Sequence, residues 1–269
     1  MGKLLVLAVA LLLAACGGDG GQRPAGAGPA PAADGFRPRT PGVLTVATEL
    51  PNPPFVLDDD LDHLEGGFEV DMVDEIAKRL GIPRVEWVGF PFTKLVAGAR
   101  CPCDFAVNGV SILPDRSQRV DFSSPYFTAN QGVLVGKGTT VAGMADARRL
   151  AFGVQEDTSG AAYLARTLKP MPEPRTFAST TAAFMALRDG QVDAVMSDVP
   201  IVVDAAHRYP GLAVAGQFKT DEQYGAVLAK GSPNTRPLSE VIDQLRDDGV
   251  LDELFQRYFP EQVNIPTLG

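Results

Sequence analysis

Residues 95–108 read LVAGARCPCDFAVN, and residues 187–197 read LRDGQVDAVMS. Each stretch contains the end of a predicted helix, a turn, an aspartate, three apolar residues and then one polar residue. Short apolar strands that alternate with helices are typical of parallel sheets with crossover helices. The repeat therefore predicts two similar α/β halves, with Asn108 and Ser197 at equivalent strand ends.

The same alternation continues on both sides of the repeat. In the first half, the pattern predicts strands at 44–48, 85–90 and 104–108 and helices at 70–80 and 92–99. In the second half, it predicts strands at 133–135, 150–154, 192–196 and 212–215 and helices at 159–168, 181–188 and 201–208. A strand at 224–230 and a helix pair within 237–259, separated at Gly249, then complete the first half.

This order of elements predicts two lobes. Lobe 1 is assembled from residues 43–131 plus 224–269, and lobe 2 from residues 132–223. Ligands of open α/β sheets bind outside the carboxyl ends of the strands. We therefore expect a cleft between the lobes, with Gly109 and Asp198 on opposite walls.

The charge balance excludes several classes of protein. The 269 residues include 33 Asp and Glu against 24 Lys and Arg, which gives a formal net charge of −9. Because nucleic-acid binding needs a basic surface, we expect no nucleic acid as a partner. The chain has 2 histidines and 3 cysteines, too few for most zinc sites and catalytic triads, so we expect no metal and no cofactor.

The N-terminal segment, MGKLLVLAVALLLAAC, has the profile of a secretory signal. Its apolar run is shorter than the roughly 20 residues of a transmembrane helix. The end of the run resembles the bacterial lipobox, which implies removal of residues 1–15 and lipidation of Cys16. An ordinary signal peptide that happens to contain a cysteine is the alternative. Residues 16–42, rich in Gly, Ala and Pro, predict a flexible tether, so we expect a protein in the periplasm or on the cell surface, lipid-anchored to the membrane.

Four stretches of the chain carry a resemblance to a known family. They are GFEVD at 67–71, ILPDR at 112–116 followed by VDFSSPY at 120–126, GVQEDTSG at 153–160 and VDAVMSD at 192–198. With these motifs in order, residues 43–260 resemble the family 3 extracellular solute-binding proteins, the amino-acid receptors of ABC importers. The resemblance implies a type II periplasmic-binding fold, with two mainly parallel sheets flanked by helices and two hinge crossovers, near 129–132 and 222–225. It also implies a monomeric binding protein, not an enzyme, that delivers an amino acid to ABC permease subunits.

The resemblance and the chemistry of a zwitterion assign a carboxylate-binding end. The planar guanidinium of Arg116 offers two donors to an α-carboxylate, although a lone arginine in such a loop is usually a solvated surface residue. Backbone N–H groups at the predicted helix start, Thr158 and Ser159, suit the same carboxylate. Asp157 replaces a glycine that is usual in the family, and its charge opposes a bound carboxylate unless it points away.

An α-ammonium needs acceptors. At the positions that the family uses, this chain has the Asp198 carboxylate, the Ser111 hydroxyl and the Gly109 carbonyl. The alternative for Asp198 is that it merely caps the helix that follows it.

Three further residues are expected to face the side chain of the ligand. Phe92 stands where the family commonly places an aromatic wall, with an ordinary core position as the alternative. Glu49 follows the first strand, where family members often carry an acid, and it favours a polar or basic amino acid. Asn52 replaces a usual aromatic residue, so one wall of the pocket is expected to be polar or missing.

Two other patterns in the sequence have both a functional and a structural interpretation. Four acids have the spacing of a calcium loop: Asp58, Asp60, Asp62 and Glu69. However, His63 replaces the glycine of its sharp turn, and the resemblance implies an exposed hairpin turn here instead. Cys101 and Cys103 form either a strained disulfide or a free thiol pair, and both alternatives stay open.

Fold does not settle function, so two rival functions stay open. The first is an enzyme on the same fold that resembles cyclohexadienyl dehydratases, for which Glu49 and Glu156 are the candidate acids. The second is a receptor that hands its ligand to a sensor partner rather than to a permease.

Overall fold

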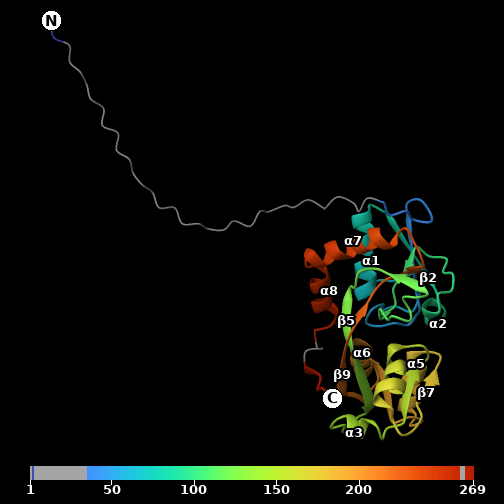
Figure 1. Cartoon of the computed structure of the whole chain (residues 1–269). Coiled ribbons are helices and arrows are strands. Elements are labelled where there is room, and N and C mark those ends of the chain that lie inside the picture. Colours follow the sequence, from blue (N-terminus) through green and yellow to red (C-terminus); the bar gives the residue numbers. More distant parts are fainter. Residues whose placement is uncertain (1, 3–34, 261–263) are drawn as a thin grey trace. The chain divides into compact units, whose positions relative to one another are not determined.

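The computed structural model describes Gly2, residues 35–260 and residues 264–269. Apart from Gly2, the predicted signal peptide lies outside the described residues, and so does Cys16. The described body contains two five-stranded sheets with flanking helices (Figure 1). We call the part built on the first sheet lobe 1 and the part built on the second sheet lobe 2.

Lobe 1 contains five strands and four helices. The strands are β1 (Val43–Thr48), β2 (Arg84–Gly89), β3 (Phe105–Ala106), β4 (Val120–Phe122) and β10 (Val227–Ala229). The helices are α1 (Phe68–Leu80), α2 (Phe92–Val96), α7 (Thr235–Asp247) and α8 (Val250–Tyr258). The strand order is β2-β1-β3-β10-β4, in which β1 is parallel to β2 and β3, and β10 is antiparallel to β3 and β4.

The helices of lobe 1 bury one apolar face each. Met72, Val73 and Ile76 recur at helical spacing along α1 and are fully buried, where α1 packs against α7 and α8. Gly81 ends α1 with φ 66°, and Gly249 separates α7 from α8 with φ 79°, as the sequence predicts. Both glycines adopt a left-handed conformation that costs other residues energy.

Lobe 2 is built in the same way. Its strands are β5 (Phe127–Gly136), β6 (Phe152–Gln155), β7 (Arg175–Phe177), β8 (Ala194–Asp198) and β9 (Leu212–Tyr224). Its helices are α3 (Met144–Ala147), α4 (Ser159–Tyr163) with the π-helical segment η1 (Leu164–Leu168), α5 (Thr180–Arg188) and α6 (Val199–Arg208). The strand order is β7-β6-β8-β5-β9, in which β6 is parallel to β7 and β8, and β5 is antiparallel to β8 and β9.

The chain crosses between the sheets from β4 to β5 and back from β9 to β10, and this arrangement confirms the predicted two-lobe α/β fold. β5 and β9 are much longer than the strands predicted at 133–135 and 212–215. The prediction missed the added halves because they carry polar residues, such as Asn130 and Glu222, in place of an apolar run.

Both ends of the described body differ from the sequence interpretation. Residues 35–42, predicted as tether, are held against lobe 1: Phe36 packs on its core, and the Asn234 side chain pairs with the main chain of Arg37 at 2.9 Å. At the other end, Leu268 lies in the core of lobe 2, although residues 224–269 were assigned to lobe 1. Gly216 makes room for it, because a Cβ on Gly216 would lie 2.6 Å from the Leu268 side chain.

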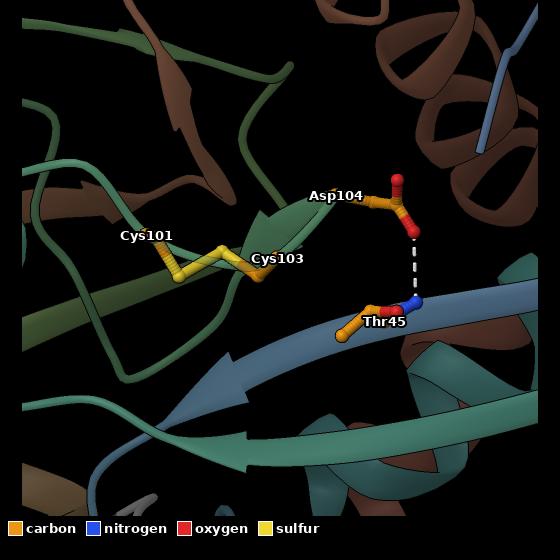
Figure 2. The surroundings of a disulfide bond; sticks show 4 residues. All are labelled: Thr45, Cys101, Cys103 and Asp104. Atoms are coloured by element: carbon orange, nitrogen blue, oxygen red, sulfur yellow. Dashed lines mark hydrogen bonds between the residues drawn. A yellow bond between two sulfur atoms is a disulfide. The ribbon is translucent and has the colours of Figure 1, made fainter. Parts of the chain in front are cut away.

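Cys101 and Cys103 form a disulfide just before β3, with their Cα atoms 5.3 Å apart (Figure 2). Asp104 follows directly, and its carboxylate accepts the Thr45 N–H at 2.8 Å and the Arg39 N–H at 2.7 Å. The turn and its aspartate therefore tie β3 to β1 and to the segment that enters the body. Of the two alternatives for Cys101 and Cys103, the structure therefore shows the disulfide, and residues 101–104 have a structural role.

Candidate ligand-binding site

Arg116 lies between β3 and β4 and is 3% exposed, which rules out a solvated surface role. Its Nη1 donates to the Ser111 carbonyl at 3.0 Å, and its Nη2 donates to the Asp157 carbonyl of lobe 2 at 2.8 Å. The guanidinium lies over the buried Phe92 ring, 5.4 Å from its centroid. The two donors of Arg116 are thus held at the junction of the lobes.

Asp198 ends β8 and precedes α6, but its carboxylate makes no capping hydrogen bond to that helix. One oxygen accepts the Tyr224 hydroxyl at 2.5 Å, and the other accepts the side-chain amide of Gln131. Burial, and after it the charge of Glu222, raises the pKa of Asp198 to about 7. The side chain therefore faces β5 and β9 instead of capping α6.

Two serine hydroxyls meet beside Asp198, one from each lobe. Ser111 Oγ donates to the Glu222 carboxylate at 2.7 Å and lies 3.3 Å from Ser159 Oγ. Gln131 Nε2 lies 3.2 Å from Ser159 Oγ and 3.1 Å from the Glu222 carboxylate. We call these five residues the polar cluster: Ser111, Gln131, Ser159, Asp198 and Glu222.

Gly109 has a left-handed backbone conformation and lies close to the Tyr224 ring, which together favour glycine. Its φ is 57°, and a Cβ would approach the Tyr224 ring to 3.3 Å. The Gly109 N–H donates to Glu69 Oε1 at 2.7 Å, and the Tyr126 hydroxyl donates to the same oxygen at 2.5 Å. Burial raises the pKa of Glu69 to about 7. The buried acid thus fixes the backbone at the predicted acceptor.

Glu49 connects the lobes at a second place. Its Oε2 accepts the Phe92 N–H at the start of α2 at 2.8 Å, and its Oε1 accepts the Gln155 amide of lobe 2 at 3.1 Å. Thr180 in turn donates to Gln155 Oε1 at 2.6 Å. The predicted side-chain acid therefore lies between the lobes, with Gln155 as a partner that the sequence analysis did not single out.

Thr158 caps α4, because its Oγ1 accepts the Ala161 N–H at 3.1 Å, and Ser159 is the first residue of that helix. Asp157 has φ 58° and an exposed side chain, so its carbonyl, not its carboxylate, meets Arg116. Asp157 thus contacts Arg116 through its main chain, and it also lines the pocket beside Arg116.

Asn52 is not joined to the polar cluster by any hydrogen bond found in the described residues. Its carbonyl accepts the N–H groups of Phe55 and Val56 at 3.0 and 2.9 Å, which closes a turn. Its Nδ2 is buried, with no hydrogen-bond partner in the described part of the chain. Asn52, which was predicted to face the side chain of the ligand, therefore lies in a turn.

A pocket of about 510 Å³ opens beside Arg116. Both lobes line it, with Leu113 and Arg119 from lobe 1 and Thr158 and Arg166 from lobe 2. Because Arg116 and Thr158 belong to the predicted carboxylate end, the pocket adjoins that end of the site.

The calcium pattern of the sequence is dispersed by the fold. Asp58 accepts the Glu65 N–H at 2.6 Å and Asp60 accepts the Asp62 N–H at 3.0 Å, whereas Glu69 is buried at Gly109. Within residues 35–260 and 264–269, no three His, Cys, Asp or Glu residues are placed to hold a metal ion.

In the same described ranges, no helix has the length and apolar character needed to cross a membrane.

Four residues complete the site without having been predicted: Gln131, Gln155, Glu222 and Tyr224. The sequence contained a signal for two of them: Glu222 and Tyr224 are two residues apart, so they lie on the same face of a strand. The strand was predicted to end at 215, which hid this alternation. Gln131 and Gln155 are neutral polar residues in strands and carry no comparable signal.

The sequence profile of the bacterial extracellular solute-binding proteins, family 3, matches residues 44–261, and the chain belongs to this family. It is 30% identical, over 94% of its length and 92% of the relative, to a probable histidine-binding protein of Neisseria gonorrhoeae. The structure of an ancestral amino acid-binding protein, a precursor of cyclohexadienyl dehydratase, is similar with a TM-score of 0.71, at 27% identity over 81% of this chain and 95% of that one. An amino acid ABC transporter substrate-binding protein of Streptococcus pneumoniae bound to L-arginine gives a TM-score of 0.70, at 26% identity over 83% and 97%.

Proposed function

We propose that this solute-binding protein captures an amino acid between its lobes and delivers it to an ABC permease. One observation carries the proposal: the buried guanidinium of Arg116 and the partly buried carboxylate of Asp198 lie at two ends of one hydrogen-bonded group, joined through Ser111, Glu222 and Gln131. A cationic group and an anionic group so arranged match the carboxylate and ammonium of a zwitterion.

In this proposal, Arg116 grips the ligand's carboxylate, together with backbone N–H groups at Thr158 and Ser159. Asp198, the Ser111 hydroxyl and the Gly109 carbonyl accept the ammonium. Burial strengthens these contacts, because charges interact more strongly where water is excluded.

The side-chain end of the site is proposed to select a polar or basic amino acid. Glu49 supplies an anionic acceptor, with Phe92 beside it and Gln155 opposite it on lobe 2. The relatives named for histidine and bound to L-arginine favour the same choice. Asn52 is proposed only as a more distant wall.

Binding is proposed to close the lobes by rotation at the crossovers near 129–132 and 222–225. The proposed division assigns residues 43–131 and the chain from 224 through α8 to lobe 1, and residues 132–223 to lobe 2. The side chains that link the lobes here, Arg116 to Asp157 and Glu49 to Gln155, suit a closed arrangement.

The protein is proposed to act as a monomer in the periplasm or at the cell surface, anchored through lipid on Cys16. The support is the lipobox-like sequence that ends at Cys16 and the extracellular family of the chain. Lipid attachment at that position leaves the chain up to residue 34 between the membrane and the first described residues of the body.

One rival function has a specific observation in its favour. Similarity to a precursor of cyclohexadienyl dehydratase favours an enzyme as the second candidate, with Glu49 and Glu156 as its candidate acids, of which Glu156 is exposed. Against it, both Glu49 oxygens already accept hydrogen bonds, from Phe92 and Gln155. A sensor partner in place of the permease uses the same binding site.

A thermal-shift panel of the twenty L-amino acids, with prephenate and arogenate added, tests the proposal. At about 100-fold excess over Kd, a ligand stabilises the folded state by about 2.7 kcal/mol, so a binder raises Tm by several degrees. No shift with any amino acid overturns the proposed function. Consumption of prephenate or arogenate supports the enzyme instead.

A further inference from the structure

Glu222 lies within the polar cluster, although the roles proposed above do not use it. Its Oε2 accepts Ser111 Oγ at 2.7 Å, and its Oε1 accepts Gln131 Nε2 at 3.1 Å. The same Gln131 nitrogen also donates to the Asp198 carboxylate. Two carboxylates from different strands therefore converge on one neutral amide.

The backbone places Glu222 there through an irregularity of the sheet. Along β5, Ala129 pairs with Glu222 and Gln131 pairs with Phe218, so three residues of β9 face one residue of β5. The Asn130 side-chain oxygen holds this bulge, accepting two of its N–H groups at 3.0 Å each. Bulges re-aim side chains, and this one brings Glu222 beside Asp198.

The charge of Arg116 acts on both acids, but within the described part of the chain Arg116 makes no hydrogen bond to either of them. The donors of Arg116 go to the carbonyls of Ser111 and Asp157 and not to Asp198 or Glu222. Two carboxylates in one site do not both ionise readily, because their charges repel each other. The other ionisable groups that act on this site are Tyr224, Tyr126, Asp115 and Arg119.

Gln131 gives a second sign that the cluster is built for a further donor. Its side chain is fully buried, and Nε2 reaches the two carboxylates and Ser159. Its Oε1, on the same amide, has no hydrogen-bond partner within the part of the chain that is described. A primary ammonium brings three donors and one positive charge, which suits two carboxylates and a neutral acceptor.

We propose that Glu222 acts with Asp198 as a two-carboxylate receptor for the ligand's ammonium group, and that ammonium binding releases one proton from this pair to the solvent. The role builds on the proposed amino-acid binding and adds a specificity-determining residue to its ammonium end. In the unliganded protein below neutral pH, Asp198 carries a proton; in the complex, the positive charge of the ammonium replaces that proton. The raised pKa of Asp198, about 7, is consistent with this exchange.

The pH dependence of binding follows from this exchange. Because the complex holds fewer protons than the unliganded pair, wild-type affinity falls as the pH drops below about 7, by up to about tenfold per pH unit. Without Glu222, the remaining acid loses its like-charged neighbour, so its pKa falls and the pH dependence of binding moves to lower pH.

The test is calorimetric titration of wild type and Glu222→Gln at pH 6 and pH 8. The probe is the strongest binder of the amino-acid panel whose side chain does not titrate in that range. Each titration is repeated in two buffers of different ionisation enthalpy, and the difference in the measured binding enthalpy gives the number of protons released. Asp221→Asn is the matched control, because it removes an exposed acid one residue away that already has φ 47°, a conformation asparagine tolerates.

Wild type is expected to release close to one proton at pH 6 and few at pH 8. Glu222→Gln is expected to bind at least about tenfold more weakly at pH 8, with the gap closing to within about threefold at pH 6. The control should match wild type at both pH values. A Glu222→Gln protein that is folded by circular dichroism but has the wild-type pH dependence overturns the role of Glu222 alone. Failure of wild type to bind any amino acid overturns the proposed function as well.

Discussion

Arg116 Nη2 in lobe 1 and the main-chain carbonyl of Asp157 in lobe 2 lie 2.8 Å apart, and this hydrogen bond joins the two lobes directly. A carboxylate is a stronger acceptor for a guanidinium than a neutral carbonyl, by roughly a factor of two. A zwitterion that enters between the lobes therefore competes well for this donor. The arginine thus links lobe closure to recognition of the ligand's carboxylate.

Replacement of Glu69 by Gln is expected to change the pH dependence of stability. The pKa of Glu69 is raised to about 7 in the folded protein, above its ordinary value, so the folded state binds the extra proton. Its contribution is therefore favourable at acidic pH and is lost as the pH rises through 7. Between pH 5 and pH 8, the free energy of unfolding should therefore decrease by roughly 2–3 kcal/mol less in Glu69→Gln than in wild type.

Urea unfolding at several pH values measures this difference in the unliganded protein. Glu65→Gln, at an exposed acid, is the control and should keep the wild-type pH dependence. An unchanged slope in Glu69→Gln would show that the buried acid does not carry the proton.

Asp198→Asn is expected to separate binding from stability. The substitution removes the counter-charge of the ammonium, so affinity should fall by roughly 30-fold to several thousand-fold. Stability at pH 8 should not fall in parallel, because the pKa of Asp198 is raised to about 7 and its buried charge is unfavourable above that pH. Titration calorimetry and Tm at pH 8 check both, with Asp189→Asn as an exposed control. Equal losses of affinity in the two variants would refute the role of Asp198.

Glu49→Gln is expected to change the preference among side chains more than overall affinity. Gln still accepts the Phe92 N–H and meets Gln155, but it lacks the negative charge that favours a cation. The ratio of Kd values for L-glutamine and L-arginine should therefore shift toward glutamine by about tenfold. A ratio that stays at the wild-type value places the side-chain acid elsewhere.

The elements that could be predicted from the sequence were predictable for one physical reason. Gly81, Gly249 and the apolar runs of β1 and β6 were readable because local backbone preference and burial agree there. Arg116 and Ser159 were assigned through the family motifs that contain them, and Ser111 as a position that the family uses. The structure brings all three to one junction.

Other parts depend on contacts distant in sequence and could not be predicted. Glu222 meets Ser111 across 111 residues, and it does so through a bulge that no local pattern reveals. Phe36 and Leu268 lie in polar or Pro-rich stretches. Phe36 is partly buried against the core of lobe 1, and Leu268 is buried in lobe 2, where Gly216 leaves it space. The positions of such residues are set by the residues that they contact in the folded chain, and those contacts are not visible in the local sequence.

Cys16→Ser is expected to abolish the membrane anchor. If Cys16 carries lipid, the wild-type protein should sediment with membranes and partition into detergent, whereas the variant should not be processed as a lipoprotein. Stable anchoring needs more than one acyl chain, because a single chain binds only marginally. Ala8→Ser, within the apolar run, is a control that should keep the anchor. A wild-type protein found wholly in the soluble fraction would contradict the lipid anchor.

The carboxylate clamp is the central claim, and titration calorimetry of Arg116→Ala with the strongest binder of the amino-acid panel tests it most directly. Removing one partner of a buried charge pair typically costs about 2–5 kcal/mol, so affinity should fall roughly 30-fold to several thousand-fold. Arg116→Lys should recover part of this loss, since it keeps the charge without the two-pronged donor geometry. Asp157→Asn, which changes the exposed neighbour, should bind like wild type. If Arg116→Ala stays folded and binds within about twofold of wild type, the clamp lies elsewhere and the site proposed here is wrong.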